Sequence, residues 1–175
     1  AAMFSDTLGR LIPVLWRRSP ELGPAELLTE VNREFPMNPV TGQYFTIVCA
    51  VLDPAARVLT CAADGNPGPA WFRTGERPRR LALPVPPVGL TADASFEQAR
   101  VELAPGDRMV FFSDGVTEAL DPQMRPYGAE HMLQVLGVDA PVAVALDEVL
   151  QDVKEHIAGG TQDDLAMLGL QLDKY

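Results

Sequence analysis

The sequence has only two cysteines and two histidines among its 175 residues. Two cysteines are too few for a disulfide framework, and Cys49 and Cys61 stand in apolar, strand-like runs that are typical of buried thiols rather than of ligands or nucleophiles. His131 and His156 fall in helical patterns, and neither has a serine or cysteine partner for a catalytic triad. The sequence therefore excludes a disulfide-rich scaffold and gives no support to a triad hydrolase.

The chain also lacks a long apolar run and an excess of basic residues. No segment reaches the length of a membrane span, and no signal peptide is visible, so we expect a cytoplasmic protein. Lys and Arg number 14 against 24 Asp and Glu, and the resulting net charge of −10 disfavours nucleic acids and anionic membrane surfaces as partners. With 47% hydrophobic residues, the chain has the size and composition of one domain with a proper core.

The one basic cluster is Arg-Pro-Arg-Arg at residues 77–80, in a proline-rich stretch. A solvated loop is the simpler interpretation of such a run. The alternative is a contact for an acidic or phosphorylated partner.

Hydrophobic periodicity predicts an α+β fold. Apolar residues at helical spacing predict helices over residues 3–16, 24–35, 128–136 and 141–156. Apolar runs between turn residues predict strands over residues 44–52, 57–63, 70–73, 96–103, 108–112 and 165–172. Strands bracketed by paired helices are typical of a sandwich in which helices pack on sheets.

Two acidic segments border apolar, strand-like runs. Asp114 follows the run that ends at Phe112, in a Ser-Asp-Gly sequence typical of a turn, whereas Asp163 and Asp164 precede the run from residue 165. If the two strands are antiparallel neighbours, these carboxylates converge at one rim of a sheet. Two charges about 4 Å apart repel by about 4 kcal/mol at an effective dielectric near 20, so such carboxylates need either a cation or a raised pKa. Ligands that are all oxygen favour Mg²⁺ or Mn²⁺ over zinc.

The sequence around these aspartates resembles the metal-dependent protein phosphatase family (PPM, type 2C), in its bacterial branch of sporulation stage II E and stress-sigma-regulator phosphatases. The resemblance covers nearly the whole chain. It is carried by Glu-Leu-Ala-Pro-Gly-Asp at 102–107, Ser-Asp-Gly-Val-Thr-Glu-Ala at 113–119, Tyr-Gly-Ala-Glu-His-Met-Leu at 127–133 and the strand after Asp163 and Asp164. It implies an α+β fold, the αββα sandwich of two mainly antiparallel sheets flanked by helices, in a single domain over residues 1–175.

The resemblance also implies a function, the hydrolysis of phosphoserine or phosphothreonine on a regulatory phosphoprotein such as an anti-sigma-factor antagonist. Asp114 matches the metal-binding aspartate of the family's Asp-Gly motif, Asp163 matches that of its last motif, and Asp164 matches the acidic neighbour, a weaker candidate ligand. The family uses two Mn²⁺ or Mg²⁺ ions and a water that bridges them, so no catalytic side chain is expected. The implied setting is the C-terminal output domain of a bacterial regulator with an upstream receiver or sensor domain, with homodimerisation left open.

The sequence departs from the family pattern in three places. The family's bridging aspartate and its Asp-x-x-Gly-His-Gly motif belong just before the helix that opens at Ala1, so we expect the N-terminal strands to be missing from this chain. Ala166 stands where the family has threonine or serine, and Ala-Asp-Gly-Asn-Pro at 63–67 replaces its Asn-Ala-Gly-His-Pro loop. The alternative is therefore a degenerate phosphatase fold that acts as a binding or adaptor module in sigma-factor control. A third interpretation of the sequence is an unrelated metal-dependent hydrolase of small phosphoesters.

Three polar residues near Asp114 are weaker candidates for a functional role. Ser113 lacks the flanking glycines of a nucleophile elbow. Glu118 and Asp121 could serve as outer carboxylates of a metal site, but we predict that both are solvated.

Overall fold

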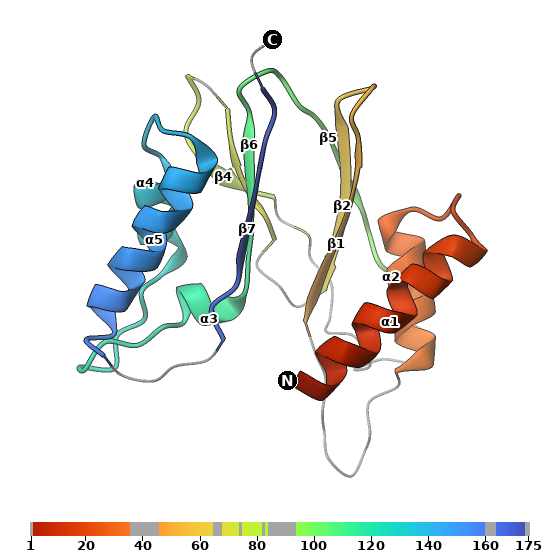
Figure 1. Cartoon of the computed structure of the whole chain (residues 1–175), viewed down its shortest axis with the longest axis horizontal. Coiled ribbons are helices and arrows are strands. Elements are labelled where there is room, and N and C mark those ends of the chain that lie inside the picture. The colour runs from red at the N-terminus through yellow and green to blue at the C-terminus, as the bar shows by residue number, and fades with distance from the viewer. Residues whose placement is uncertain are drawn as a thin grey trace. The chain divides into compact units, whose positions relative to one another are not determined.

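The computed structural model describes residues 2–35, 46–64, 68–73, 75–81, 83, 94–159 and 164–173. The chain divides into two compact units, the first formed by Ala1–Asn66 and Leu83–Glu102 and the second by Pro67–Ala82 and Leu103–Tyr175. Each unit contains one antiparallel sheet with its own helices (Figure 1). Among the described residues, no helix combines the length and the apolar character that crossing a membrane requires.

The first unit contains helices α1 and α2 and a three-stranded sheet. The sheet order is β1-β2-β5, and both pairings are antiparallel. Leu27, Leu28 and Val31 lie on one face of α2, at the spacing of an amphipathic helix, and are buried in the core of this unit together with Phe96. The bounds of its elements are α1 Ala2–Arg18, α2 Pro24–Glu34, β1 Ile47–Asp53, β2 Val58–Asp64 and β5 Ala99–Glu102.

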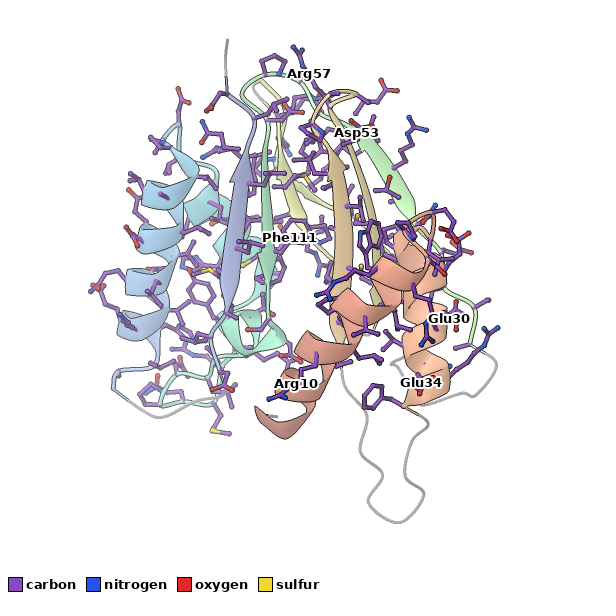
Figure 2. All side chains as sticks on the ribbon, turned by 45° about the vertical axis from the view of Figure 1, so that its right-hand side comes forward. Arg10, Glu30, Glu34, Asp53, Arg57 and Phe111 are labelled. Atoms are coloured by element: carbon purple, nitrogen blue, oxygen red, sulfur yellow. The ribbon has the colours of Figure 1, made fainter. Side chains whose placement is uncertain are left out.

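A short turn closes the hairpin between β1 and β2. The Asp53 carboxylate accepts a hydrogen bond of 2.8 Å from the Ala56 N–H, and Arg57 adopts a φ of 55°, a left-handed conformation that reverses the chain. Figure 2 shows Asp53 and Arg57 together at the end of this hairpin. The turn fixes a register in which Asp53 pairs with Val58, so the strands predicted over residues 44–52 and 57–63 form an antiparallel hairpin.

The second unit contains a four-stranded sheet of order β4-β3-β6-β7, in which every pairing is antiparallel. Helices α4 and α5 lie on one face of this sheet (Figure 1). The bounds of its elements are β3 Ala70–Phe72, β4 Arg79–Arg80, β6 Arg108–Phe112, α3 Asp114–Thr117, α4 Ala129–Leu136, α5 Val142–His156 and β7 Met167–Gln171.

Strand β6 runs through the middle of this sheet, and alternate side chains of the strand face the helices. Val110 and Phe112 share one hydrophobic cluster with Met132 of α4 and Val149 of α5, and all four are buried. The cluster anchors the end of β6 against the helices. The residue that follows Phe112 by two positions, Asp114, is thereby held at a rigid border of the core.

The structure confirms the helices and strands predicted from the sequence, with ends that shift by a few residues. Two short elements were missed, β4 and α3. The prediction that residues 77–80 form a loop is wrong for Arg79 and Arg80, because they pair with β3. The prediction of a Ser-Asp-Gly turn is also wrong, because Asp114 begins a one-turn helix in which Gly115 is buried and does not have a positive φ.

Candidate functional site

The end of β6 lies beside the beginning of β7, as the site predicted from the sequence requires. The two strands pair antiparallel from Arg108 opposite Gln171 to Phe112 opposite Met167. The pairing continues one step beyond the strands, where the Ser113 N–H donates a hydrogen bond of 2.9 Å to the Ala166 carbonyl. The prediction that these two strands are antiparallel neighbours is therefore confirmed.

The Ser113 side chain joins the two strand ends a second time. Its Oγ donates a hydrogen bond of 3.0 Å to the Asp164 carbonyl and accepts one of 3.1 Å from the Ala166 N–H. Because Ser113 directly precedes Asp114 in the chain, these bonds hold the backbone of Asp164 close to that of Asp114. The sequence around Ser113 argues against a nucleophile and does not indicate this role, although a serine at a strand end often bonds to nearby backbone groups.

Asp114 is a half-buried residue at the first position of α3. Its Oδ1 accepts a hydrogen bond of 2.9 Å from the Gly115 N–H, and its carbonyl accepts one of 2.8 Å from the Glu118 N–H. Its Oδ2 has no partner among the residues that the structure describes. One oxygen thus orients the carboxylate while the other stays available, as expected for a metal ligand.

The other two predicted ligands are placed less completely. Asp164 is exposed three residues before the start of β7, and its backbone is held by Ser113. Asp163 lies outside the described residues. Among the described residues, no group of three or more His, Cys, Asp or Glu is arranged to hold a metal ion. The donors at this rim are carboxylates, and their chemistry fits Mg²⁺ or Mn²⁺.

Asp121 is not solvated, so that prediction is wrong. It is a buried residue whose Oδ1 accepts hydrogen bonds from the Gln123 N–H (2.8 Å) and the Arg125 N–H (2.9 Å). Arg125 Nε also donates to Asp121 Oδ2 at 2.7 Å. These bonds, of which that from the Arg125 N–H is the strongest influence, lower the pKa of Asp121. Asp121 therefore organises its own loop, whereas Glu118 is exposed as predicted.

The histidines and cysteines behave largely as the sequence predicts. His131 lies on α4, and its Nε2 is 2.6 Å from Asp152 Oδ2, while His156 at the end of α5 contacts the Arg125 carbonyl. Cys61 is buried and Cys49 is half-buried, both are unpaired, and burial raises the pKa of each thiol to about 11. Neither thiol has the lowered pKa of a reactive nucleophile.

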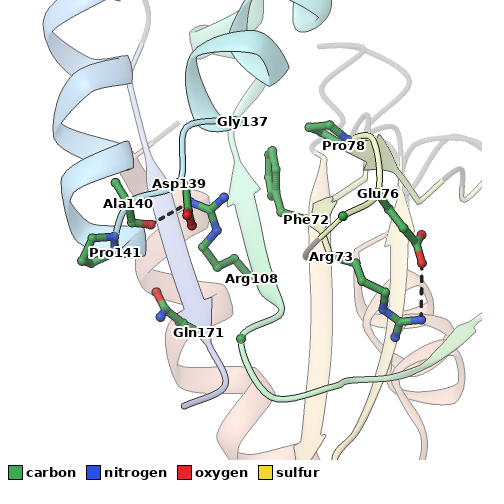
Figure 3. Close-up of a pocket in the computed structure, with 12 residues that line it drawn as sticks. Phe72, Arg73, Glu76, Pro78, Arg108, Gly137, Asp139, Ala140, Pro141 and Gln171 are labelled. Atoms are coloured by element: carbon green, nitrogen blue, oxygen red, sulfur yellow. Dashed lines mark hydrogen bonds and ion pairs between the residues drawn. The ribbon is translucent and has the colours of Figure 1, made fainter. Parts of the chain in front are cut away.

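A cavity of about 580 Å³ opens in the second unit at the opposite ends of β6 and β7 (Figure 3). Its lining includes Phe72, Arg108 and Gln171, which are cross-strand neighbours in one row of the sheet. Arg108 donates a hydrogen bond of 2.9 Å to the Ala140 carbonyl of the loop before α5. Since Asp114 and Asp164 do not line this cavity, it is separate from the carboxylate rim.

Comparison with known proteins gives the family. The sequence model of the family Stage II sporulation protein E (SpoIIE) matches residues 1–173. The chain belongs to the SpoIIE family. Protein IcfG of Synechocystis sp. is 28% identical to it over 93 residues, which cover 52% of this chain and 15% of that protein.

Solved structures show the fold. The SiaA-PP2C domain of Pseudomonas aeruginosa matches 93% of this SpoIIE-family chain and 66% of its own chain with a TM-score of 0.80 and 18% identity. The SpoIIE phosphatase domain of Bacillus subtilis matches 99% and 75% (TM-score 0.70, 17% identity), and the RsbU and RsbW domains of a Mycobacterium tuberculosis protein match 99% and 49% (0.75, 22%). The predicted α+β sandwich of PP2C-type phosphatases is therefore the fold of this chain. The chain spans 66% of the SiaA structure and 15% of IcfG.

Proposed function

We propose that this SpoIIE-family chain is a metal-dependent phosphatase domain that hydrolyses phosphoserine or phosphothreonine on a regulatory phosphoprotein, such as an anti-sigma-factor antagonist. The observation that carries the proposal is the clamp of Ser113 on the Asp164 carbonyl and the Ala166 N–H. It brings together the two segments that match the family's metal-binding motifs.

Asp114, Asp163 and Asp164 are the proposed ligands for Mn²⁺ or Mg²⁺, with two ions in the complete site. Bound ions of this kind offset charge on the phosphoryl oxygens and lower the pKa of a coordinated water. The chain itself supplies position. The Gly115 N–H orients the Asp114 carboxylate through Oδ1, and the buried end of β6 prevents its backbone from shifting. No side chain of this rim is assigned the role of nucleophile.

The alternative, a degenerate fold that works as a binding or adaptor module, is favoured by Ala166. Its backbone N–H and carbonyl both bond to Ser113, so its place beside the carboxylate rim is well defined. An alanine there has no hydroxyl group to offer to a metal-bound ligand or a phosphate. The proposed catalysis therefore depends on the carboxylates alone.

We also propose a setting for the domain. Residues 1–175 form one phosphatase domain of a cytoplasmic bacterial regulator that carries a receiver or sensor domain upstream. The small share of IcfG that the chain covers supports a larger regulator, as does the Mycobacterium tuberculosis protein, in which an RsbW domain accompanies the RsbU domain. The negative net charge of the chain supports a protein partner over nucleic acid or a membrane. A homodimer is compatible with the proposal.

The test is hydrolysis of p-nitrophenyl phosphate by the full-length protein in Mn²⁺ and in EDTA. We expect Mn²⁺-dependent turnover that falls by about 100-fold or more in Asp114→Asn and Asp163→Asn, because each variant removes a ligand charge without changing side-chain volume. Asp147→Asn, an exposed position on α5, is the matched control and should keep full activity.

Two results would contradict the proposal. Full activity in Asp114→Asn would exclude Asp114 as a metal ligand. Absence of turnover in every condition, with the protein folded by circular dichroism, would favour the binding module.

A further inference from the structure

Three arginines gather at the edge of the second unit's sheet. Arg77, Arg79 and Arg80 are all exposed, in a chain whose net charge is −10. Within the part of the chain that the structure describes, none of the three forms an ion pair or a side-chain hydrogen bond. Their positive charges are therefore available to a partner.

The cluster is built on a buried support. Asp107 is only 2% exposed, and its Oδ2 accepts hydrogen bonds from Trp71 Nε1 (3.2 Å) and Arg73 Nη2 (3.1 Å). The Trp71 ring, fixed in this way, has the Arg79 guanidinium 4.1 Å from its centroid and that of Arg73 at 4.5 Å. Stacking on a buried ring restricts the rotamers of Arg79, so less conformational entropy is lost when the guanidinium binds an anion.

The arginines flank an open sheet edge. Within the described residues, β4 is the last strand on its side of the sheet, with Arg79 opposite Trp71 and Arg80 opposite Ala70. Successive residues of a strand point to opposite faces, so Arg79 and Arg80 lie on either side of this edge. Charged residues on edge strands also prevent unwanted pairing of sheets. One charge serves that purpose, whereas three arginines within four positions form a concentrated positive surface.

The surface lies within reach of the carboxylate rim in the same sheet. Arg80 pairs with Ala70, which pairs with Val110, and Asp114 follows Val110 by four residues. Two strands across the sheet correspond to roughly 10 Å. The four residues from Val110 to Asp114, the last two of which lie beyond β6, advance by at most roughly 13 Å, so the diagonal separation is at most about 16 Å. A protein interface of about 800 Å² per partner covers both points.

We propose that Arg77, Arg79 and Arg80 form a docking surface for an acidic segment of the phosphoprotein substrate. The inference rests on the proposed function and adds a substrate class to it, a phosphoserine with glutamates or aspartates roughly five residues away. The negative remainder of the chain repels such a segment, so the arginine surface also orients the encounter.

The test uses two synthetic phosphoserine peptides. One carries a five-residue glutamate tract on the N-terminal side of the phosphoserine, and the other carries it on the C-terminal side. Each is compared with a matched peptide in which glutamine replaces glutamate. In the full-length protein we expect the glutamate tract on one side to lower KM by about tenfold, since each exposed charge pair contributes modestly. The double variant Arg77→Glu/Arg80→Glu should abolish this preference and leave hydrolysis of p-nitrophenyl phosphate unchanged. Arg17→Glu/Arg18→Glu, a matched charge reversal at exposed positions of α1, should keep the preference.

A binding measurement separates this inference from the proposed function. In EDTA, where no hydrolysis takes place, fluorescence anisotropy should show tighter binding of the glutamate peptide to the wild-type protein than to Arg77→Glu/Arg80→Glu, and the difference should shrink as salt is added. If this binding difference is found but the protein shows no turnover in Mn²⁺, the proposed function is overturned and the docking surface is supported. Equal affinity for glutamate and glutamine peptides on both sides, in an active enzyme, would overturn the docking surface.

Discussion

At the scale of single residues, the neighbours Ser113 and Asp114 have different roles in the candidate site. Asp114 is the proposed cation ligand, whereas Ser113 is not a proposed ligand and instead holds the opposite strand in place. A carboxylate at a strand end is effective only if the second strand stays in register, because a ligand set must be positioned to within a fraction of an ångström. The serine is therefore as important to the geometry as the aspartate is to the chemistry.

Ser113→Ala tests whether Ser113 positions the proposed metal ligands. The substitution removes both side-chain hydrogen bonds to the β7 segment while it leaves Asp114 and Asp163 unchanged. We expect the affinity for Mn²⁺ to fall by about tenfold, as for other residues that support metal ligands, and the free energy of unfolding to fall by about 1 kcal/mol. Calorimetric titration with Mn²⁺ and thermal unfolding measure the two effects.

Ser95→Ala is the control, because Ser95 is exposed outside this site. An unchanged Mn²⁺ affinity in Ser113→Ala would show that the clamp does not position the ligands. Restoration of affinity by Ser113→Thr, which keeps the hydroxyl group, would support the positioning role.

At the scale of elements, helices α4 and α5 are tied together by a polar group beside their apolar contact. Asp152 Oδ2 of α5 accepts a hydrogen bond of 2.7 Å from the hydroxyl of Tyr127, just before α4, and lies 2.6 Å from His131 Nε2. The Tyr127 bond, followed by His131, lowers the pKa of Asp152, while burial and the carboxylate raise the pKa of Tyr127. The ionised form of Asp152 thus stabilises the helix pair.

The pKa shift of Asp152 predicts how stability depends on pH. A folded-state pKa below the ordinary value of 3.8 gives a contribution that is present above about pH 4 and disappears as the pH falls further. We expect Asp152→Asn to lower the free energy of unfolding by about 0.5 to 1 kcal/mol at pH 6, a range that allows for the solvent exposure of the pair, and by progressively less as the pH falls below 4. Urea unfolding at a series of pH values measures the difference.

The matched control for this helix pair is Asp147→Asn, which changes an exposed carboxylate on the same helix. It should follow the wild-type curve at every pH. A stability difference between wild type and Asp152→Asn that does not shrink as the pH falls below 4 would mean that the side chain acts through packing and not through its charge.

The sequence predicts well those elements whose apolar pattern extends over enough residues to be recognised. Strand β6 follows the predicted bounds because its apolar run is framed by Asp107 and Ser113, and α5 is long and amphipathic. Strand β4 was missed because Arg79 and Arg80 have no apolar alternation, and only pairing with β3 makes them a strand. Local sequence contains no information on that partner.

The candidate site also has features that the sequence predicts and features that it does not. That the end of β6 lies beside the segment before β7 was predictable, because two strand borders and one assumption about pairing suffice. The Ser113 clamp was not, since its partners lie 51 and 53 residues away. Asp121 was assigned to solvent because its type favours exposure, but a tight loop buries it by satisfying its oxygens with the backbone.

At the scale of the whole molecule, the path of the chain makes the two units depend on each other. Each unit consists of two separate stretches of sequence, and β3 and β4 of the second unit lie in the sequence between β2 and β5, which pair in the first unit. Neither sheet is complete until both stretches have folded. An interleaved path of this kind favours one cooperative transition over independent unfolding of two units.

The two tryptophans make this expectation testable, because Trp16 belongs to the first unit and Trp71 to the second. In Trp16→Phe, fluorescence reports on Trp71 alone, and in Trp71→Phe it reports on Trp16 alone. We expect the fluorescence midpoint in urea to coincide with the far-ultraviolet circular dichroism midpoint within each variant. Each variant is its own reference, so the loss of the Trp71 hydrogen bond to Asp107 shifts both probes equally. A fluorescence midpoint that departs from the circular dichroism midpoint in either variant would show that one unit unfolds while the other persists, in spite of the shared chain path.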